Sequence, residues 1–300
     1  MMKVLNFGSL NVDYVYKVPH VIVRGETLSA KSRAVFSGGK GLNQSVALGR
    51  AGLSVYHAGC IGEDGEFLLE ELRKAHVNVN FIRRLKDVPT GHTVIQNTAD
   101  GDNCIILFGG ANQAVSKEFV DEVFGSFEKG DLVILQNEIS NLKYIVEKAH
   151  AAGMIIALNP SPMNEIIREL PLNYIHYFFL NEIEAGQITG KSSDDKEGLV
   201  LGLKDCFPDA EIILTLGSAG SVYISKEQVI FQEAYKVPAV DTTAAGDTFT
   251  GYYLASVTQG KAPAEALDFA SRAAAIAVSS PGAAPSIPDW ESVLQWEIPI

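Results

Sequence analysis

The chain has 300 residues, 47% hydrophobic and 20% charged, enough to bury a large core as one domain spanning 1–300. Lys and Arg total 24 against 36 Asp and Glu, and a net charge of −12 would repel a polyanion, so we expect no nucleic-acid partner. No apolar run is long enough to cross a bilayer or to act as a signal sequence, so we expect a cytoplasmic protein without a membrane partner.

The three cysteines, Cys60, Cys104 and Cys206, are widely spaced and odd in number, and they lack paired Cys/His ligand spacing. This pattern favours neither a disulfide framework nor a zinc site. We therefore expect buried, reduced thiols.

The first informative segment in chain order is a glycine turn, Ser-Gly-Gly-Lys-Gly-Leu-Asn-Gln-Ser at 37–45, followed by an amphipathic stretch. Glycine permits close approach of the backbone to a ligand, and the pattern predicts a helix that carries Lys40 and Asn43. No G-x-G-x-x-G sequence occurs, and the Gly-Lys-Ser at 190–192 lacks the first glycine of a P-loop. A P-loop or a Rossmann site for a dinucleotide oxidoreductase is therefore disfavoured.

Two segments, 14–36 and 90–108, lack a convincing helical period. The second contains short apolar runs at 93–97 and 104–108, separated by Ala-Asp-Gly-Asp at 99–102. This arrangement predicts a β-hairpin.

From residue 132 onward, apolar runs alternate with helical patterns. The runs lie at 132–135, 154–158, 175–180 and 212–216, and the helical patterns lie at 141–152, 163–170 and 182–188. Strands buried on both faces are almost continuously apolar, and a β-α-β-α order connects parallel strands. The sequence therefore predicts an α/β fold with a mainly parallel sheet.

Near the C-terminus, Asp-Thr-Thr-Ala-Ala-Gly-Asp at 241–247 precedes an apolar helical stretch. The small residues Ala244, Ala245 and Gly246 expose backbone N–H groups at a helix N-terminus, where the macrodipole favours an anion. A carboxylate is repelled by a bound phosphate, so Asp247 is better explained as a base that takes a proton from an attacking hydroxyl. The alternative is that Asp247 caps the helix.

These two turns, Gly-Gly-Lys-Gly-x-Asn and Asp-Thr-x-Ala-x-Gly-Asp, resemble the two signatures of the ribokinase (PfkB) family of carbohydrate kinases. Further segments resemble that family in the right order, and they lie at 8–13, 25–27, 181–184, 215–220 and 282–286. The resemblance implies a three-layer α/β/α domain with a mainly parallel sheet and a small β-sheet lid over the sugar, formed by approximately 14–36 and 90–108. The alternative for the hairpin is a solvated one without a ligand role.

The resemblance also implies a sugar site, because a polyol needs several hydrogen-bond donors and acceptors at once. The residues with this role are Asn11, Asp13, Gly39, Lys40, Asn43, Glu138 and Asp247. Taken singly, Asn11 and Asp13 suit a turn after a strand, and Glu138 suits a solvated helix start. His92, on an expected lid strand, either reshapes the sugar pocket or points to solvent, and Asn112 receives no role.

On the nucleotide side the resemblance implies ATP and magnesium, with Glu184 organising magnesium-bound water and phosphate. The ATP-binding residues are Asn181, Glu184, Thr215, Gly217, Ser218, Gly220 and Gly246. The alternatives are a helix cap for Asn181 and Glu184 and a plain hairpin turn for 215–220.

A monovalent cation, potassium, follows from the same resemblance. The matching residues are Asp241, Thr243, Ala277, Ser280, Gly282 and Ser286, which offer hard oxygen donors. The sequence Ser-Ser-Pro at 279–281 departs from the more basic residues that the family often carries there.

The implied activity is transfer of the γ-phosphoryl group of ATP to a primary hydroxyl such as the 5-hydroxyl of D-ribose, with Asp247 as the base and the 244–246 amides holding the developing charge. The acceptor alternatives are a ketose, a deoxysugar or a nucleoside such as pseudouridine. A catalytically silent sugar-binding regulatory protein is the alternative of another class, and the intact Asp247, Lys40 and Glu184 argue against it. An exposed edge of the lid sheet would suit a homodimer.

Overall fold

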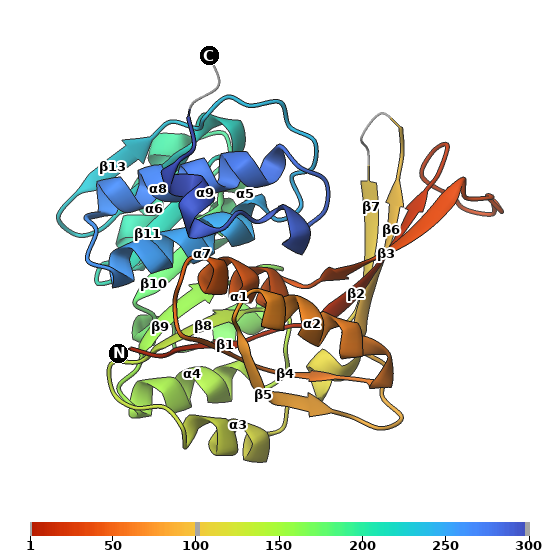
Figure 1. The fold of residues 1–300 in the computed structure, drawn as a ribbon. Coiled ribbons are helices and arrows are strands. Elements are labelled where there is room, and N and C mark those ends of the chain that lie inside the picture. Colours follow the sequence, from red (N-terminus) through yellow and green to blue (C-terminus); the bar gives the residue numbers. More distant parts are fainter. Residues whose placement is uncertain (1, 100–102, 298–300) are drawn as a thin grey trace.

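The computed structural model of the protein describes residues 2–99 and 103–297, and within these residues the strands form two separate sheets (Figure 1). The larger sheet has the strand order β13-β12-β11-β10-β9-β8-β1-β4-β5, and the smaller has the order β3-β2-β6-β7. The strands are β1 (Val4–Phe7), β2 (Asn11–Lys17), β3 (Ser32–Gly38), β4 (Val55–Ile61), β5 (Asn78–Arg84), β6 (Gly91–Asn97), β7 (Asn103–Phe108), β8 (Leu132–Gln136), β9 (Ile155–Asn159), β10 (Tyr177–Asn181), β11 (Glu211–Thr215), β12 (Ser221–Ile224) and β13 (Val229–Gln232).

Helices cover both faces of the large sheet, which gives the molecule three layers. One face carries α1 (Lys40–Arg50), α2 (Glu66–Lys74), α7 (Ala245–Thr258), α8 (Pro263–Val278) and α9 (Trp290–Leu294). The other carries α3 (Lys117–Phe124), α4 (Leu142–Ala151), α5 (Glu182–Thr189) and α6 (Lys196–Cys206). This arrangement confirms the predicted three-layer α/β/α fold.

Neighbouring residues of the central strands face opposite layers. Val4 of β1 and Leu132 of β8 pack in the core beneath α1 and α7, whereas Leu5 and Val133 pack beneath α3 and α4. Both faces of each strand are therefore buried, which explains the continuous apolar runs. Pairing is parallel from β5 across to β11, and β12 and β13 are antiparallel at the edge, so the predicted mainly parallel sheet is confirmed.

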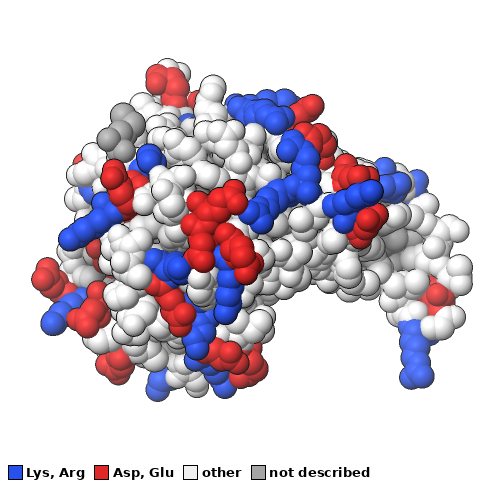
Figure 2. All heavy atoms as spheres, turned by 90° about the horizontal axis from the view of Figure 1, so that it is seen from below, with Lys and Arg blue, Asp and Glu red and all other residues white. Residues whose placement is uncertain are grey.

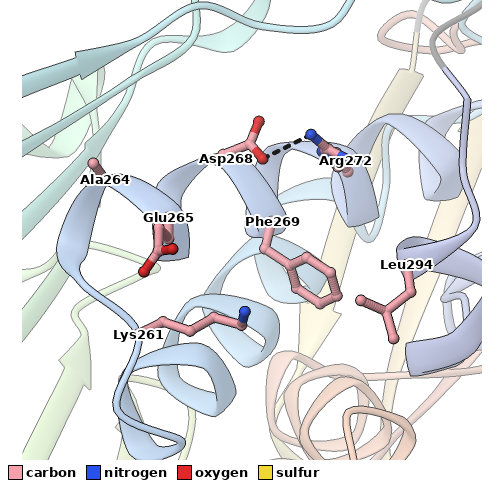
Figure 3. A pocket seen from close by; sticks show the side chains of 7 residues that line it. All are labelled: Lys261, Ala264, Glu265, Asp268, Phe269, Arg272 and Leu294. Carbon is pink, nitrogen blue, oxygen red and sulfur yellow. Dashed lines mark ion pairs between the residues drawn. The ribbon is translucent and has the colours of Figure 1, made fainter.

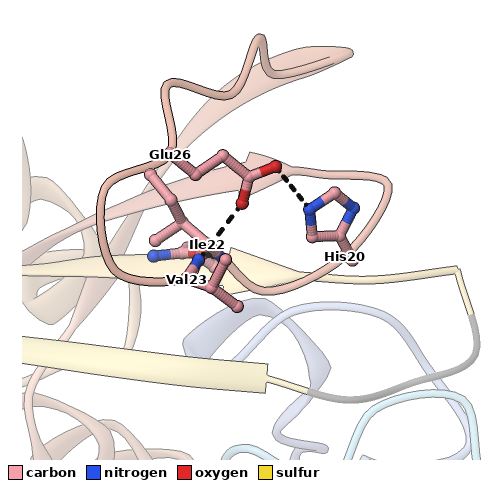
Figure 4. Close-up of polar contacts among 5 residues, drawn as sticks. His20, Ile22, Val23 and Glu26 are labelled. Atoms are coloured by element: carbon pink, nitrogen blue, oxygen red, sulfur yellow. Dashed lines mark hydrogen bonds and ion pairs between the residues drawn. The ribbon is translucent and has the colours of Figure 1, made fainter.

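The small sheet contains the segments expected to form a lid, and it projects from the side of the molecule in Figure 1. The antiparallel pairing of β6 with β7 confirms the predicted hairpin, and residues 100–102 of its turn lie outside the described residues. In the loop between β2 and β3, Glu26 accepts a hydrogen bond from the Val23 N–H (3.2 Å) and pairs with His20 Nε2 (2.8 Å), as Figure 4 shows.

The two faces of the small sheet carry different side chains. Asp13 and Thr93 are cross-strand neighbours on one face, where the Thr93 hydroxyl donates to Asp13 Oδ1 at 2.5 Å. Side chains alternate along a strand, so His92 lies on the opposite face. There its ring packs against Tyr14 and Phe108, with ring centroids 5.9 and 5.0 Å apart. The structure thus places His92 in an aromatic cluster directed away from Asp13.

Two sequence-based expectations are wrong in part. The 163–170 segment forms only a 3₁₀ turn, Glu165–Glu169, because Pro171 disfavours helical backbone in the residue before it. Cys104 and Cys206 are exposed, since one lies on the edge strand β7 and the other in the last turn of α6. Only Cys60 is buried among the three, and burial raises the pKa of its thiol to about 11.

None of the helices in the described ranges combines the length and apolar character needed to span a membrane. Figure 2 shows basic side chains interspersed with acidic ones on the face it presents, so no continuous basic surface forms there.

Candidate active site

The predicted turn at 241–247 leads into α7, whose first turn contains Gly246 and Asp247. The N–H of Ala245 is already used, because it donates to the carbonyl of Thr242 at 3.2 Å. The Gly246 and Asp247 amides have no acceptor within the helix and face its N-terminal end. A Cβ atom added to Gly246 would meet nothing within 4 Å, so open space adjoins these donors. An anion can therefore approach the start of α7.

The Asp247 side chain is bound by α1 rather than by its own helix. Asn43 Nδ2 donates to Asp247 Oδ2 at 3.0 Å, and Gln44 Nε2 donates to Oδ1 at 2.9 Å. Asp247 is 5% exposed, so its contact with solvent is small. Both carboxylate oxygens are directed at α1, and this geometry does not fit the alternative of a helix cap.

Burial raises the pKa of the Asp247 carboxyl above its ordinary value, while the Lys40 ammonium and the two amide donors partly oppose that rise. Burial alone would lower the pKa of Lys40, but the negative charges of Asp247, Glu138 and Glu184 together raise it. Lys40 therefore keeps its positive charge beside the carboxylates at neutral pH.

The start of α1 depends on close backbone packing. Gly39 has a φ of 95°, a left-handed conformation that favours glycine. A Cβ atom on Gly41 would lie 2.3 Å from the Ser9 backbone nitrogen. Glu138 Oε2 accepts hydrogen bonds from the Lys40 N–H (3.1 Å) and from the Ser9 hydroxyl, and burial raises the pKa of this carboxyl. Glu138 is thus a half-buried carboxylate at the N-terminus of α1, not a solvated helix start.

Asn11 and Asp13 lie on β2 with fixed hydrogen-bond partners. Asn112 Nδ2 donates to Asn11 Oδ1 at 2.7 Å, and the Leu10 N–H donates to Asn112 Oδ1 at 3.0 Å. The Oδ1 atom of the Asn11 amide is therefore occupied by Asn112. Asp13 is 8% exposed, and burial raises its pKa to about 6, although the hydrogen bond from Thr93 opposes the rise. Asn112, which the sequence left without a role, orients Asn11.

A cavity of about 100 Å³ joins the N-terminus of α7 to the carboxyl ends of three strands. Its lining residues are Lys40, Asn159, Phe179, Leu180, Asn181, Glu184, Thr215, Thr243, Gly246, Asp247 and Thr250. Ligands of α/β proteins bind at the carboxyl ends of parallel strands, so this is the expected edge of the sheet. The cavity therefore brings together residues that the sequence assigned to catalysis, to sugar binding, to nucleotide binding and to cation binding.

Asn181 and Glu184 form a capping box at the start of α5. The Glu184 N–H donates to Asn181 Oδ1 at 2.8 Å, and the Asn181 N–H donates to Glu184 Oε2 at 3.0 Å. The capping alternative is therefore observed, and both residues also line the cavity. Helix capping does not prevent Glu184 from accepting further hydrogen bonds in the cavity, since a carboxylate has several acceptor positions.

The remaining nucleotide candidates form the turn after β11. Thr215 lines the cavity, but Gly217, Ser218 and Gly220 do not. Gly217 has a φ of 54° and Gly220 a φ of 115°, and a Cβ atom on Gly220 would lie 2.0 Å from the Gln232 carbonyl oxygen. Glycine is thus required here to bring the turn against the end of β13.

Three of the cation candidates meet at Asp241. Its Oδ1 accepts from the Thr243 N–H (3.0 Å) and hydroxyl (2.5 Å), and its Oδ2 accepts from the Gly282 N–H (3.0 Å). Asp241 therefore ties the segment before α7 to the loop after α8.

Of the other cation candidates, Ala277 lies in the last turn of α8, and Ser280 and Ser286 lie after it. The Ser280 N–H donates to the Ala277 carbonyl at 3.2 Å, and the Ser286 hydroxyl donates to the Ala283 carbonyl at 2.9 Å. One carboxylate with carbonyls and hydroxyls suits a hard monovalent cation. Within residues 2–99 and 103–297, no three His, Cys, Asp or Glu side chains are grouped so that they could bind a metal ion.

The polar residues Gln44, Asn159 and Thr250, which contact Asp247 or line the cavity, escaped the sequence analysis. Gln44 follows Asn43 directly and was read as part of the glycine turn. Asn159 is the last residue of β9, just as Asn181 is the last residue of β10. A polar residue at the carboxyl end of an apolar run could therefore have identified Asn159 as a residue of the site. Thr250 lies one helical turn after Gly246, whose carbonyl accepts from its hydroxyl at 2.9 Å, and nothing in its spacing distinguished it.

A second hollow, of about 390 Å³, lies against α8 and α9 (Figure 3). It is lined by Lys261, Ala264, Glu265, Asp268, Phe269, Arg272 and Leu294. Arg272 pairs with Asp268 at 3.0 Å, so opposite charges balance within it. It contains no residue that the sequence predicted for chemistry.

Comparison with known proteins agrees with this geometry. Residues 1–290 match the pfkB family carbohydrate kinases. The ribokinase of Staphylococcus aureus (strain COL) is 34% identical over 307 residues, which cover 98% of this chain and 99% of that protein.

Two solved structures are similar over nearly their whole length. Arabidopsis thaliana ribokinase complexed with ribose and ATP has a TM-score of 0.88 and 32% identity, covering 98% of each chain. Cryptococcus neoformans var. grubii serotype A ribokinase in complex with ADP has a TM-score of 0.86 and 32% identity, covering 98% of this chain and 99% of that one. The chain therefore belongs to the PfkB family of carbohydrate kinases, phosphotransferases that act on a sugar hydroxyl.

Proposed function

We propose that the protein transfers the γ-phosphoryl group of ATP to the 5-hydroxyl of D-ribose, with Asp247 as general base. One observation carries this proposal: the buried Asp247 carboxylate lines one cavity with Lys40 and the amide end of α7. A base, a cation and free N–H donors are the groups that phosphoryl transfer needs. The similar proteins from Staphylococcus and Arabidopsis, both ribokinases, support ribose as the acceptor.

In this reaction Asp247 accepts the proton of the attacking hydroxyl while the new O–P bond forms and the bond to ADP breaks. Amides of the 244–246 turn and Lys40 stabilise the charge on the transferring oxygens. Because the Ala245 amide is bonded to Thr242, Gly246 is the main donor of that turn. Magnesium, when bound, neutralises phosphate charge, and Asn181 and Glu184 would hold its water.

The two substrates are assigned to opposite sides of Asp247. The sugar hydroxyls are bound by Asn11, Asp13, Gly39, Lys40, Asn43 and Glu138, and the nucleotide lies along Thr215, Gly217, Ser218 and Gly220. Asn43 Oδ1 is buried without a partner among the described residues, which suits an acceptor reserved for a sugar hydroxyl. The segments 14–36 and 90–108 act as a lid that excludes water from this single kinase domain, residues 1–300.

The test is ADP release by the purified protein with a panel of acceptors. We expect the highest kcat/KM with D-ribose. A higher value with a ketose, 2-deoxyribose or pseudouridine would assign a different acceptor to the same machinery. Binding of sugar without ADP release across the panel would support the silent regulatory protein instead.

Potassium is expected to activate the enzyme. Without a bound potassium ion, the carbonyl oxygens around Asp241 would repel one another and loosen the adjoining start of α7. The initial rate should therefore fall in sodium-only or choline buffer and recover with potassium. Asp241→Asn should abolish this response, and equal wild-type rates in all three buffers would show that the ion is not used.

A second copy of the chain is expected to pack on the small sheet. Ile105, Ile106, Leu107 and Phe108 of the edge strand β7 are all exposed, an apolar surface unusual for a monomer. Light scattering should give twice the 32.3 kDa chain mass. Ile105→Glu and Ile106→Glu charge opposite faces of β7, and at least one should yield monomers, whereas Leu201→Glu on α6 should not. A wild-type monomer at micromolar concentration would refute the dimer.

A further inference from the structure

Three amide side chains form a hydrogen-bonded chain that ends at Asp247, and none of the three lines the cavity. Gln44 Oε1 accepts from Gln136 Nε2 at 2.7 Å, Gln136 Nε2 also donates to Asn6 Oδ1 at 3.2 Å, and Asn6 Nδ2 donates to the Gly41 carbonyl at 2.8 Å. Gln44, Gln136 and Asn6 are each 0% exposed. They come from α1, β8 and β1: Asn6 lies between Leu5 and Phe7, Gln136 follows Leu135, and Gln44 lies between Asn43 and Ser45.

The orientation of the three amide groups is fixed at the end of the hydrogen-bonded chain that lies farthest from Asp247. The Gly41 carbonyl can only accept, so Asn6 must turn its NH₂ group toward it and its Oδ1 toward Gln136. Gln136 must then present its NH₂ group to Gln44, whose own NH₂ group is left for Asp247. A backbone carbonyl thus determines that Asp247 Oδ1 meets a donor rather than an acceptor.

Maintaining the chain carries a structural cost. Gln136 Oε1 is buried without a hydrogen-bond partner among the described residues, a condition that is unfavourable in a core. Gly8 is also constrained, because a Cβ atom there would lie 2.5 Å from Gln136 Oε1 and 2.7 Å from Asn6 Oδ1. Apolar side chains on β1 and β8 would leave no unpaired polar atom at this place, so packing alone does not account for these amides.

We propose that Gln136 and Asn6 are positioning residues that orient Gln44, so that its N–H group holds the Asp247 carboxylate ionised and in place for the acceptor hydroxyl. This inference rests on the proposed role of Asp247 as the base. Gln136 and Asn6 do not line the cavity, so they act through Gln44.

The chain of amides matters because the other groups around Asp247 act on its ionisation in opposite directions. Burial disfavours its ionised form, and the carboxylates Glu138 and Glu184 stand nearby, while the Lys40 ammonium offsets them in part. Asn43 supplies a second side-chain donor to the carboxylate. Losing the Gln44 donor, or letting that amide flip, therefore makes Asp247 easier to protonate.

The test is Gln136→Met, which keeps the length of the side chain and removes its donor. We expect the acid limb of the kcat–pH profile to move up by roughly one pH unit and kcat near neutrality to fall about tenfold. The sugar KM should stay within about twofold, because the sugar-binding side chains are untouched. Gln44→Met, which deletes the donor itself, should shift the acid limb at least as far and serves if Gln136→Met does not fold.

A double-mutant cycle separates positioning from a general structural effect. In the Asp247→Asn background, Gln136→Met should leave the residual kcat unchanged, because the group it acts through is gone. An equal fractional loss in both backgrounds, or an unmoved acid limb in both Gln136→Met and Gln44→Met, would overturn the inference. If Asp247→Asn itself leaves kcat near wild type, the proposed base fails instead, so the two failures are distinguishable.

Discussion

Replacing Asp247 by asparagine is expected to lower kcat by about 10²–10⁴ while sugar and ATP still bind. Asparagine preserves the shape of the side chain but cannot accept the hydroxyl proton, so the loss should appear in kcat rather than in the binding constants. Steady-state kinetics combined with calorimetric titration of sugar and nucleotide measure both.

A matched control is Glu265→Gln, which also removes a carboxylate from the first turn of a neighbouring helix. Glu265 caps α8 by accepting from the Ala262 N–H at 3.1 Å and has no contact with the cavity at α7. It should lower stability slightly and leave kcat unchanged. The same pattern in Asp247→Asn, with a lower Tm and a kcat near wild type, would make Asp247 a structural residue.

Asp13→Ala is expected to raise the sugar KM by roughly 5- to 150-fold, because each buried group left without a partner costs roughly 1–3 kcal/mol. Tyr14→Phe is the matched control, since Tyr14 lies on the same strand but on the opposite face of the small sheet. An unchanged sugar KM in folded Asp13→Ala would remove Asp13 from the site.

The same residue should give stability a pH dependence of known sign. Burial raises the pKa of Asp13 from 3.8 to about 6, so the folded protein binds this proton more tightly than the unfolded chain. The contribution of protonated Asp13 to the stability of the folded protein is fully present below about pH 4 and is lost as the pH rises through about 6. Thermal melts should therefore show Asp13→Asn more stable than wild type near neutrality, with the difference narrowing toward about pH 4.

The strands that the sequence predicted well are those buried on both faces, such as β8 and β11, because burial leaves a continuous apolar run. The glycine turns were equally clear, since Gly39 and Gly41 meet constraints that only glycine satisfies. The 163–170 segment was misread because its apolar spacing is helical while the proline after it prevents a full helix.

Gln44, Gln136 and Asn6 could not be predicted as a group. Asn6 lies inside an apolar run, Gln136 ends one, and Gln44 lies on a helix between Asn43 and Ser45. None of these local sequences indicates which side chain of another element the residue will contact. Their positions are separated by 92 residues between Gln44 and Gln136 and by 130 between Asn6 and Gln136. Only the order of strands in the sheet, with β1 beside β8, brings them together.

The contact between α1 and α7 also has a consequence for synthesis of the protein on the ribosome. Every residue of α1 from Gly41 to Gly49 is buried, and α7, which lies in the last fifth of the chain, supplies part of the cover. Asn43 and Asp247 are 204 positions apart, so α1 emerges long before its partner helix. Until α7 has left the exit tunnel, the apolar side of α1 has only part of its final packing, and a nascent chain stalled before residue 245 lacks the proposed base Asp247.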